Sequence, residues 1–182
     1  MSAPAGLREL LLSRIADVQD HPQPGVVFKD ITPLLDDPAA FGALTEAFAE
    51  LCERHRVDKV VGLEARGFIL AAPVAIRAGV GFVPVRKAGK LPRATLRQAY
   101  ELEYGTAEIE IHADALAPGE RVLVIDDVLA TGGTADASLQ LIRRAGAEVA
   151  GVAVLLELDF LAGRQRLEPG LKGAPLEVLI TV

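Results

Sequence analysis

The stretch at residues 122–134, which reads VLVIDDVLATGGT, limits the possible folds of this chain more than any other. It begins with four apolar, mostly β-branched residues at 122–125, a pattern typical of a strand buried on both faces of a parallel sheet. Two carboxylates, Asp126 and Asp127, follow, and small residues then lead into a helical pattern at 135–145. A strand, a turn and a helix in this order predict one unit of a parallel α/β sheet.

The turn after this strand has the features of a site for a phosphorylated sugar. Its residues are Ala130, Thr131, Gly132, Gly133 and Thr134. The free N–H groups and the dipole at the start of a helix can hold a phosphate, and glycines let the backbone come close because they lack Cβ. The carboxylates of Asp126 and Asp127 can accept hydrogen bonds from sugar hydroxyls. The alternative is an ordinary strand, turn and helix with a solvated acidic turn.

Composition narrows the class of protein. A length of 182 residues predicts a single domain over 1–182, and a hydrophobic fraction of 51% with only 4% aromatics predicts an aliphatic core. The net charge of −6 argues against a general nucleic-acid binder, and the single Cys52 excludes an intrachain disulfide framework. No run approaches the roughly 18 apolar residues of a membrane span, and no signal peptide precedes the chain, so we expect a cytoplasmic protein without a membrane partner.

Helical and strand patterns alternate along the rest of the chain. Apolar spacing predicts helices at 7–18, 38–55 and 68–78. Strands are predicted at 26–31, 59–63, 81–85, 106–111, 148–156 and, at an edge, 176–182. This alternation predicts an α/β fold with a mostly parallel central sheet flanked by helices.

The segment 86–104 has no apolar period, so we expect it to be a loop without regular structure. Its charge is unusual, because five basic residues occur with no acidic residue between positions 86 and 97: Arg86, Lys87, Lys90, Arg93 and Arg97. In a chain that is acidic overall, this reversal favours a loop that handles anions. The alternative is a solvated surface loop.

Several ordered blocks give the chain a resemblance to a known family. They read PGVVFKDITPLL at 24–35, GLEARGF at 62–68, PVRKAGKLP at 84–92, LEYGTAEIEIHADAL at 102–116 and VLVIDDVLATGGT at 122–134. In these blocks the chain resembles the adenine phosphoribosyltransferases, one group of the type I phosphoribosyltransferases. The resemblance implies the type I phosphoribosyltransferase fold, with a flexible hood loop and return strand at 86–111. It also implies transfer of a phosphoribosyl group from phosphoribosyl diphosphate (PRPP) to N9 of adenine, giving AMP and diphosphate in purine salvage.

The resemblance implies a role for each block. Asp126, Asp127 and the 130–134 turn would bind the ribose 5-phosphate part of PRPP or AMP. Diphosphate would be bound by the turn Glu64, Ala65, Arg66 and Gly67 together with Arg86, Lys87 and Lys90. The segment 21–35 would bind the base through Val27, Phe28 and Lys29, with Phe28 stacking on adenine, the Val27 main chain reading its edge and Arg66 approaching N7.

Catalysis is implied for Glu103, Arg66 and Lys87. Glu103 would accept or steer the purine proton, and Tyr104 in the hood would help to seal the site. Mg²⁺ is the implied cofactor, held mainly by substrate oxygens and water rather than by a dedicated set of protein ligands. The partners implied are adenine, PRPP and a second copy of the chain, since cations of this family can reach across a dimer interface.

Other readings stay open from the sequence. One is a phosphoribosyltransferase for another purine base, such as hypoxanthine, guanine or xanthine. Another is a PRPP-sensing regulator that keeps the fold and binds nucleic acid, although the chain has neither an added DNA-binding segment nor a basic face. Lys29 also departs from the Arg that many relatives carry there, which removes the planar fork of a guanidinium.

Overall fold

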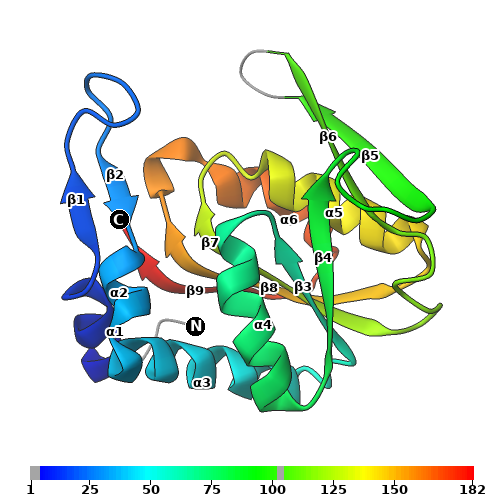
Figure 1. The fold of residues 1–182 in the computed structure, drawn as a ribbon, viewed down its shortest axis with the longest axis horizontal. Coiled ribbons are helices and arrows are strands. Elements are labelled where there is room, and N and C mark those ends of the chain that lie inside the picture. Colours follow the sequence, from blue (N-terminus) through cyan, green and yellow to red (C-terminus); the bar gives the residue numbers. More distant parts are fainter. Residues whose placement is uncertain (1–4, 102–104) are drawn as a thin grey trace.

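A seven-stranded sheet runs through the computed structural model, which describes residues 5–101 and 105–182. The strand order is β5-β6-β4-β3-β7-β8-β9 (Figure 1). The strands are β3 Lys59–Leu63, β4 Gly81–Lys87, β5 Thr95–Glu101, β6 Thr106–His112, β7 Arg121–Leu129, β8 Glu148–Glu157 and β9 Leu176–Thr181. The pairs from β4 through β3, β7 and β8 to β9 are parallel, and only β5 and β6 run antiparallel to their neighbours. The predicted mostly parallel sheet is therefore confirmed.

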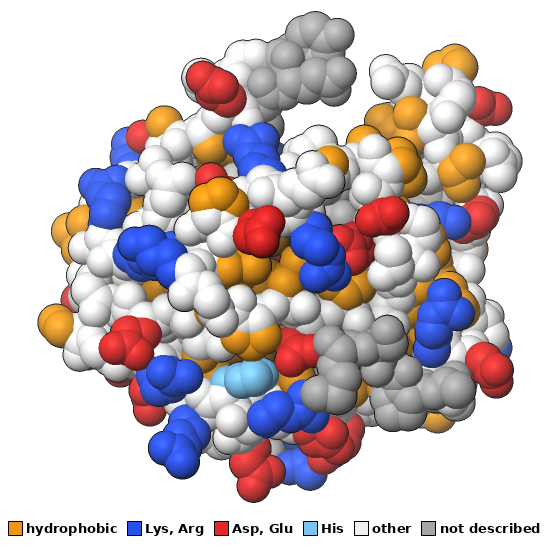
Figure 2. Space-filling view, turned by 180° about the vertical axis from the view of Figure 1, so that it is seen from behind, with side chains coloured by type: hydrophobic (Ala, Val, Ile, Leu, Met, Phe, Trp, Pro, Cys, Tyr) orange, Lys and Arg blue, Asp and Glu red, His pale blue; other side chains and the backbone are white. Residues whose placement is uncertain are grey.

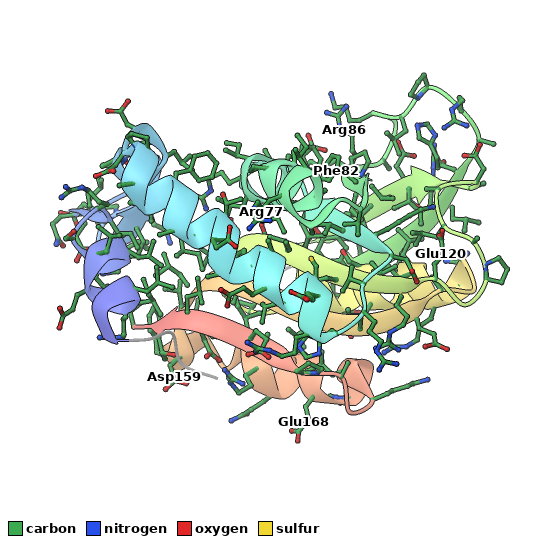
Figure 3. The ribbon with its side chains drawn as sticks, turned by 90° about the horizontal axis from the view of Figure 1, so that it is seen from below. Arg77, Phe82, Arg86, Glu120, Asp159 and Glu168 are labelled. Atoms are coloured by element: carbon green, nitrogen blue, oxygen red, sulfur yellow. The ribbon has the colours of Figure 1, made fainter. Side chains whose placement is uncertain are left out.

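Helices cover both faces of this sheet, because alternate strand residues point to opposite sides. Val60 and Leu123 pack into one apolar cluster, whereas Val61 and Val124 pack into the other. The helices are α1 Ala5–Leu12, α2 Thr32–Asp36, α3 Pro38–Arg54, α4 Arg66–Ala78, α5 Gly133–Arg144 and α6 Gly163–Leu171, with a short 3₁₀ turn η1 Asp159–Leu161. Side chains of α3 and α4 belong to the first cluster (Figure 3), and those of α5 and α6 belong to the second.

A small hairpin stands apart from the main sheet. Strand β1, Ala16–Val18, pairs antiparallel with β2, Phe28–Asp30, so that Val18 lies opposite Phe28. The prediction of a helix over 7–18 is therefore wrong beyond Leu12. The apolar spacing continues past that point, but pairing with residues distant in sequence overrides a local period.

The segment 86–104 also differs from its prediction, because β5 lies within it. β5 pairs with β6 from Thr95 opposite His112 to Glu101 opposite Thr106. Glu110 on β6 is 0% exposed and holds the base of this hairpin by accepting from the Lys90 and Leu91 N–H groups at 2.9 Å and from Arg97 Nε at 3.1 Å. Burial opposes the charged form, but hydrogen bonds from the backbone of residues 89–91 and from the Thr95 hydroxyl outweigh it and lower the pKa of Glu110.

Strand β7 is longer than the apolar run that predicted it. It continues through Asp126 and Asp127 to Leu129, because its pairing with β8 continues from Asp126 opposite Val154 to Leu129 opposite Glu157. The two carboxylates are thus strand residues, fixed by sheet hydrogen bonds, and do not belong to the turn.

The surface carries charges of both signs. In Figure 2, acidic and basic side chains are interspersed over one face, with apolar side chains between them. Within residues 5–101 and 105–182, no helix is both long and apolar enough to cross a membrane.

Candidate active site

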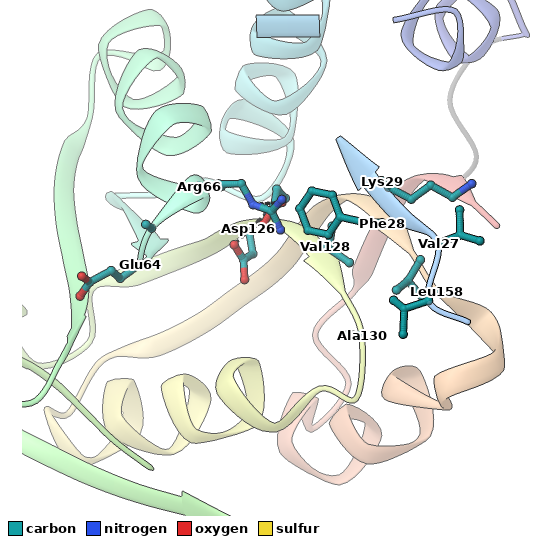
Figure 4. Close-up of a pocket in the computed structure, with 12 residues that line it drawn as sticks. Val27, Phe28, Lys29, Glu64, Arg66, Asp126, Val128, Ala130 and Leu158 are labelled. Atoms are coloured by element: carbon teal, nitrogen blue, oxygen red, sulfur yellow. Dashed lines mark hydrogen bonds and ion pairs between the residues drawn. The ribbon is translucent and has the colours of Figure 1, made fainter. Parts of the chain in front are cut away.

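A cavity of about 430 Å³ opens at the carboxyl ends of β3, β7 and β8 (Figure 4). Ligands of open α/β sheets bind at this edge, where loops from neighbouring parallel strands meet. Its walls are Val26, Val27, Phe28, Lys29, Glu64, Ala65, Arg66, Asp126, Asp127, Val128, Ala130 and Leu158. The structure therefore brings together the segments at 26–29, 64–66 and 126–130, which lie far apart in the sequence.

Asp127 provides a buried acceptor in this cavity. It is 4% exposed, and its Oδ2 lies 2.7 Å from Nε of Arg66. That contact is an ion pair without hydrogen-bond alignment, because Oδ2 has no aligned donor among the described residues. A buried carboxylate oxygen without a donor is well suited to accept a ligand hydroxyl.

Asp126 lies beside Asp127 in β7. Its Oδ1 accepts from the Asp127 N–H at 2.9 Å. Burial, and then the charge of Asp127, raise the pKa of Asp126 well above its ordinary value. Asp126 therefore takes up a proton more readily than an isolated carboxylate.

Arg66 links the carboxylates to the base-binding segment. Besides its contact with Asp127, its guanidinium lies 5.0 Å from the centroid of the Phe28 ring, in cation–π geometry. His21 meets the same ring edge-on, with centroids 5.1 Å apart. One side chain at the start of α4 thus contacts both the aromatic wall and the acidic wall of the cavity.

Val27 and Lys29 flank Phe28 in the cavity wall. Neither the N–H nor the C=O of Val27 makes a backbone hydrogen bond within the described residues. Lys29 borders the cavity, but its ammonium points away from Phe28 in Figure 4 and bonds both carboxylate oxygens of Asp17, at 2.7 and 2.9 Å. Its charge is therefore used to close the hairpin.

The turn after β3 faces the cavity with its backbone, and its Glu64–Ala65 peptide is cis. The Glu64 side chain points away from Asp126 (Figure 4), accepting from the Lys87 N–H at 2.9 Å and pairing with Arg86 at 3.3 Å. Burial opposes the charged form of Glu64, but the Lys87 N–H and the Arg86 guanidinium lower its pKa overall.

The predicted diphosphate cations lie outside the cavity wall. Arg86 is paired with Glu64, while Lys87 and Lys90 are exposed and their ammonium groups make no ion pair in the described part of the chain. Their charges are available at the surface, but the structure does not bring them to the carboxylates. Glu103 and Tyr104 lie outside the described residues.

The turn at 130–134 is supported by the start of α6. Gly132 has φ of +78°, and a Cβ there would lie 2.8 Å from the Gly163 carbonyl oxygen. A Cβ on Gly163 would overlap the Ala130 carbonyl. Ala130 lines the cavity, whereas Thr131, Gly132, Gly133 and Thr134 lead away from it into α5.

Sequence reasoning missed Val26, Val128 and Leu158 as cavity residues. Leu158 had a usable signal, because it directly follows a predicted buried strand at 148–156 and so belongs at the same edge of the sheet as Asp126. Val26 and Val128 had no such signal, since apolar residues in or beside strands are usually core.

Gly67 offers a test of this geometry. A Cβ there would lie 2.8 Å from Asp126 Oδ1 and 2.9 Å from the Ile125 carbonyl oxygen. We expect Gly67→Ala to displace Asp126, to weaken binding of ribose 5-phosphate about tenfold, and to lower the free energy of unfolding by about 1–3 kcal/mol. Calorimetric titration and urea unfolding measure both effects.

The matched control is Gly42→Ala in α3, where a Cβ would meet nothing within 4 Å. That variant should keep ribose 5-phosphate binding and gain about 0.5–1 kcal/mol of stability from helix propensity. If Gly67→Ala bound ribose 5-phosphate as the wild type does, this would contradict the close contact of Gly67 with Ile125 and Asp126.

The chain is similar to a known family of proteins. A family model described as the phosphoribosyl transferase domain matches residues 30–173. The adenine phosphoribosyltransferase of Streptomyces coelicolor is 74% identical over 100% of both chains, and that of Streptomyces avermitilis is 72% identical over the same share.

Solved structures agree as well. Adenine phosphoribosyltransferase from Rhodothermus marinus superposes with a TM-score of 0.91 and 49% identity, covering 98% of this chain and 100% of that one. The Saccharomyces cerevisiae protein, whose structure contains adenine, has a TM-score of 0.90 and 38% identity over 97% of this chain and 100% of that one. The fold predicted from the sequence blocks is confirmed, and the chain belongs to the adenine phosphoribosyltransferase family.

Proposed function

We infer that this chain transfers the phosphoribosyl group of PRPP to N9 of adenine, giving AMP and diphosphate for purine salvage. The observation that carries this inference is the single cavity in which Phe28, Arg66 and Asp127 meet. An aromatic wall next to buried carboxylates suits a purine joined to a ribose, which is the arrangement in AMP. Members of the family at 70% identity or more carry the name of this activity.

The ribose 5-phosphate part binds between β7 and α5. Residues 130–134 hold the 5′-phosphate through backbone N–H groups at the start of α5, with the Thr131 and Thr134 hydroxyls as further donors. Asp126 and Asp127 accept from the ribose 2′- and 3′-hydroxyls. The buried Asp127 Oδ2, which has no aligned donor in the described residues, supports this role.

The diphosphate binds at the turn of residues 64–67, with Arg86, Lys87 and Lys90 supplying positive charge. The exposure of Lys87 and Lys90 supports this assignment, because neither ammonium group makes an ion pair in the described part of the chain. Arg86 contributes its charge to this site while it also pairs with Glu64.

Mg²⁺ accompanies the diphosphate. No group of three or more His, Cys, Asp or Glu side chains in the described residues could hold a metal ion. The site still fits a hard cation, because Asp126 and Asp127 offer oxygen ligands beside the place of the ribose hydroxyls. The ion, held mainly by substrate oxygens and water, supplies positive charge to the departing diphosphate.

Adenine lies against Phe28, with the edge that carries its amino group toward the Val27 backbone and N7 toward Arg66. A main-chain N–H facing N1 and a C=O facing the 6-amino group match adenine. Hypoxanthine presents the reverse pattern at these positions, which would leave buried groups unpaired and so be rejected strongly. The Val27 N–H and C=O, which make no backbone hydrogen bond in the described residues, support this reading.

Catalysis by this site is mostly positioning and electrostatics. The transition state at ribose C1 has oxocarbenium character, so carboxylates held on the adjacent hydroxyls favour the positive charge that develops there. Fixing base and ribose in one cavity supplies the orientation, and covering them excludes the water that would hydrolyse PRPP. Arg66 and Lys87 act on the leaving diphosphate.

A product assay tests the activity. With PRPP and Mg²⁺, the chain should convert adenine to AMP and leave hypoxanthine, guanine and xanthine unreacted, because only adenine satisfies the Val27 backbone. Chromatography of the nucleotides measures this. IMP, GMP or XMP would contradict the base assignment, and tight PRPP binding without any product would instead favour a regulatory protein.

Glu103 is proposed to accept or steer the purine proton, and Tyr104 to help seal the site. Both come within three residues of the end of β5 at Glu101, and Tyr100 of β5 contacts Thr134 in the turn at 130–134. We expect Glu103→Gln to bind PRPP as the wild type does and to lower kcat by about 10²-fold or more. Turnover close to that of the wild type would show that no general base is needed at this position.

A homodimer is proposed on the face of α4 and β4. Ile69, Ile76 and Phe82 are 45%, 83% and 37% exposed there, which is unusual for large apolar side chains. We expect light scattering to give the mass of two chains, and Ile76→Glu to give one. Phe160→Glu, at a side chain 77% exposed elsewhere, is the control and should keep the dimer. A wild-type chain of single mass would contradict the dimer.

A cytoplasmic location completes the proposal. Cys52 is buried and unbridged, as is usual for proteins of a reducing compartment, and burial raises the pKa of its thiol to about 11. Fractionation of cells that express the chain would check this, and recovery from a secreted or membrane fraction would contradict it.

A further inference from the structure

Tyr100, on the hood strand β5, reaches the phosphate turn from outside the cavity. Its hydroxyl oxygen lies 3.2 Å from Oγ1 of Thr134, and both side chains are half-buried. Thr134 is the second residue of α5, and its carbonyl oxygen accepts from the Ser138 hydroxyl at 2.7 Å. In this contact the Thr134 hydroxyl donates to the Tyr100 oxygen, its hydrogen-bond partner within the described residues.

β5 is fixed against α5 at both ends, so this contact is held by the fold. At the far end of α5, Nη1 of Arg144 donates to the Arg97 carbonyl at 2.6 Å and to the Gln98 side-chain oxygen at 3.0 Å. The ring of Tyr100 packs against the apolar cluster on the α5 face of the sheet. Its hydroxyl is thus placed on Thr134 by packing and does not depend on a mobile side chain.

The contact between these two hydroxyls can reverse its direction. A hydroxyl has one donor and two acceptor sites, so either oxygen can accept from the other. Without a ligand the Thr134 O–H points at Tyr100. When a phosphate oxygen accepts from the Thr134 O–H, the phenol, which is the more acidic of the two, donates to Thr134 Oγ1, and the two bonds strengthen each other.

We propose that Tyr100 is a positioning residue for the 5′-phosphate, acting through a relay from Tyr100 O–H to Thr134 Oγ1 and from Thr134 O–H to a phosphate oxygen. The proposal rests on the inferred role of Thr134 as a phosphate donor. It adds a hood residue to the phosphate site and gives β5 a direct connection with the ribose 5-phosphate end of the substrate.

Tyr100→Phe removes the hydroxyl and keeps the ring. We expect it to weaken AMP binding and raise the KM for PRPP about two- to tenfold, the value of one hydrogen bond, while kcat and adenine binding stay near wild type. Calorimetric titration with AMP and with adenine separates the two ends of the ligand. Equal weakening of AMP and adenine would show a general change in the cavity and would overturn the relay.

A double-mutant cycle isolates the relay from general destabilisation. Thr134→Val removes the intermediate hydroxyl, so adding Tyr100→Phe to it should not weaken AMP binding further. In the matched Thr131→Val background, whose hydroxyl does not contact Tyr100, Tyr100→Phe should weaken AMP by the same factor as in the wild type. Thr134→Ser, which keeps a hydroxyl, should retain sensitivity to Tyr100→Phe.

The outcomes that overturn the relay are distinct from those that overturn the function. Full AMP affinity in Tyr100→Phe, or the same loss in the wild-type and Thr134→Val backgrounds, overturns the relay alone. A wild-type chain that binds no AMP overturns the proposed function and the relay together. If Tyr100→Phe melts early, AMP binding is measured below its melting transition. Comparison of Thr134→Val with Thr134→Ser then decides whether the Thr134 hydroxyl binds the phosphate.

Discussion

No side chain fits between the turn at Gly67 and the carboxylate of Asp126, and the active site depends on that close contact. A Cβ on Gly67 would come within 2.8 Å of Asp126 Oδ1. The contact exists because β3 and β7 are parallel neighbours, with Gly62 opposite Ile125. The turn that follows β3 therefore begins at the level of Asp126. The proposed diphosphate turn and the proposed ribose carboxylates thus keep a fixed separation, as a reaction at a carbon between them would require.

Arg66 extends this arrangement to the base. As the first residue of α4 it follows the turn directly, and it contacts Asp127 and Phe28 at once. The hairpin that carries Phe28 is closed in turn by the ion pair of Lys29 with Asp17. The segments proposed to bind diphosphate, ribose and base are thus joined by short contacts between side chains from separate parts of the chain.

Much of this could be predicted from the sequence, for local reasons. The strand at 59–63 was predicted with its observed bounds, because the residues after Lys59 form a short apolar run. The structure buries all four of them. The phosphate turn was recognisable because its small residues lie between a buried strand and a helix. Phe28, Arg66, Asp126 and Asp127 were assigned to one site by family resemblance, and the structure brings them into one cavity.

The rest depended on partners far away in the sequence. β5 has polar residues such as Arg97 and Gln98, and its strand is defined by pairing with β6 and by the buried Glu110. β1 likewise exists only through its pairing with β2. Glu64 and Arg86, both predicted to bind diphosphate, pair with each other in the structure. No local sequence pattern indicates this pairing.

The contact of α6 with the phosphate turn has a consequence for how the protein is made. Gly163 packs against Ala130 and Gly132, so the turn gains its support from a residue that the ribosome adds some thirty positions later. Loop closure over that distance must precede the final shape of the turn, as for any contact of high sequence separation. A nascent chain that has already emerged through α5 can therefore form most of its sheet while the proposed phosphate-binding turn still lacks the support of α6.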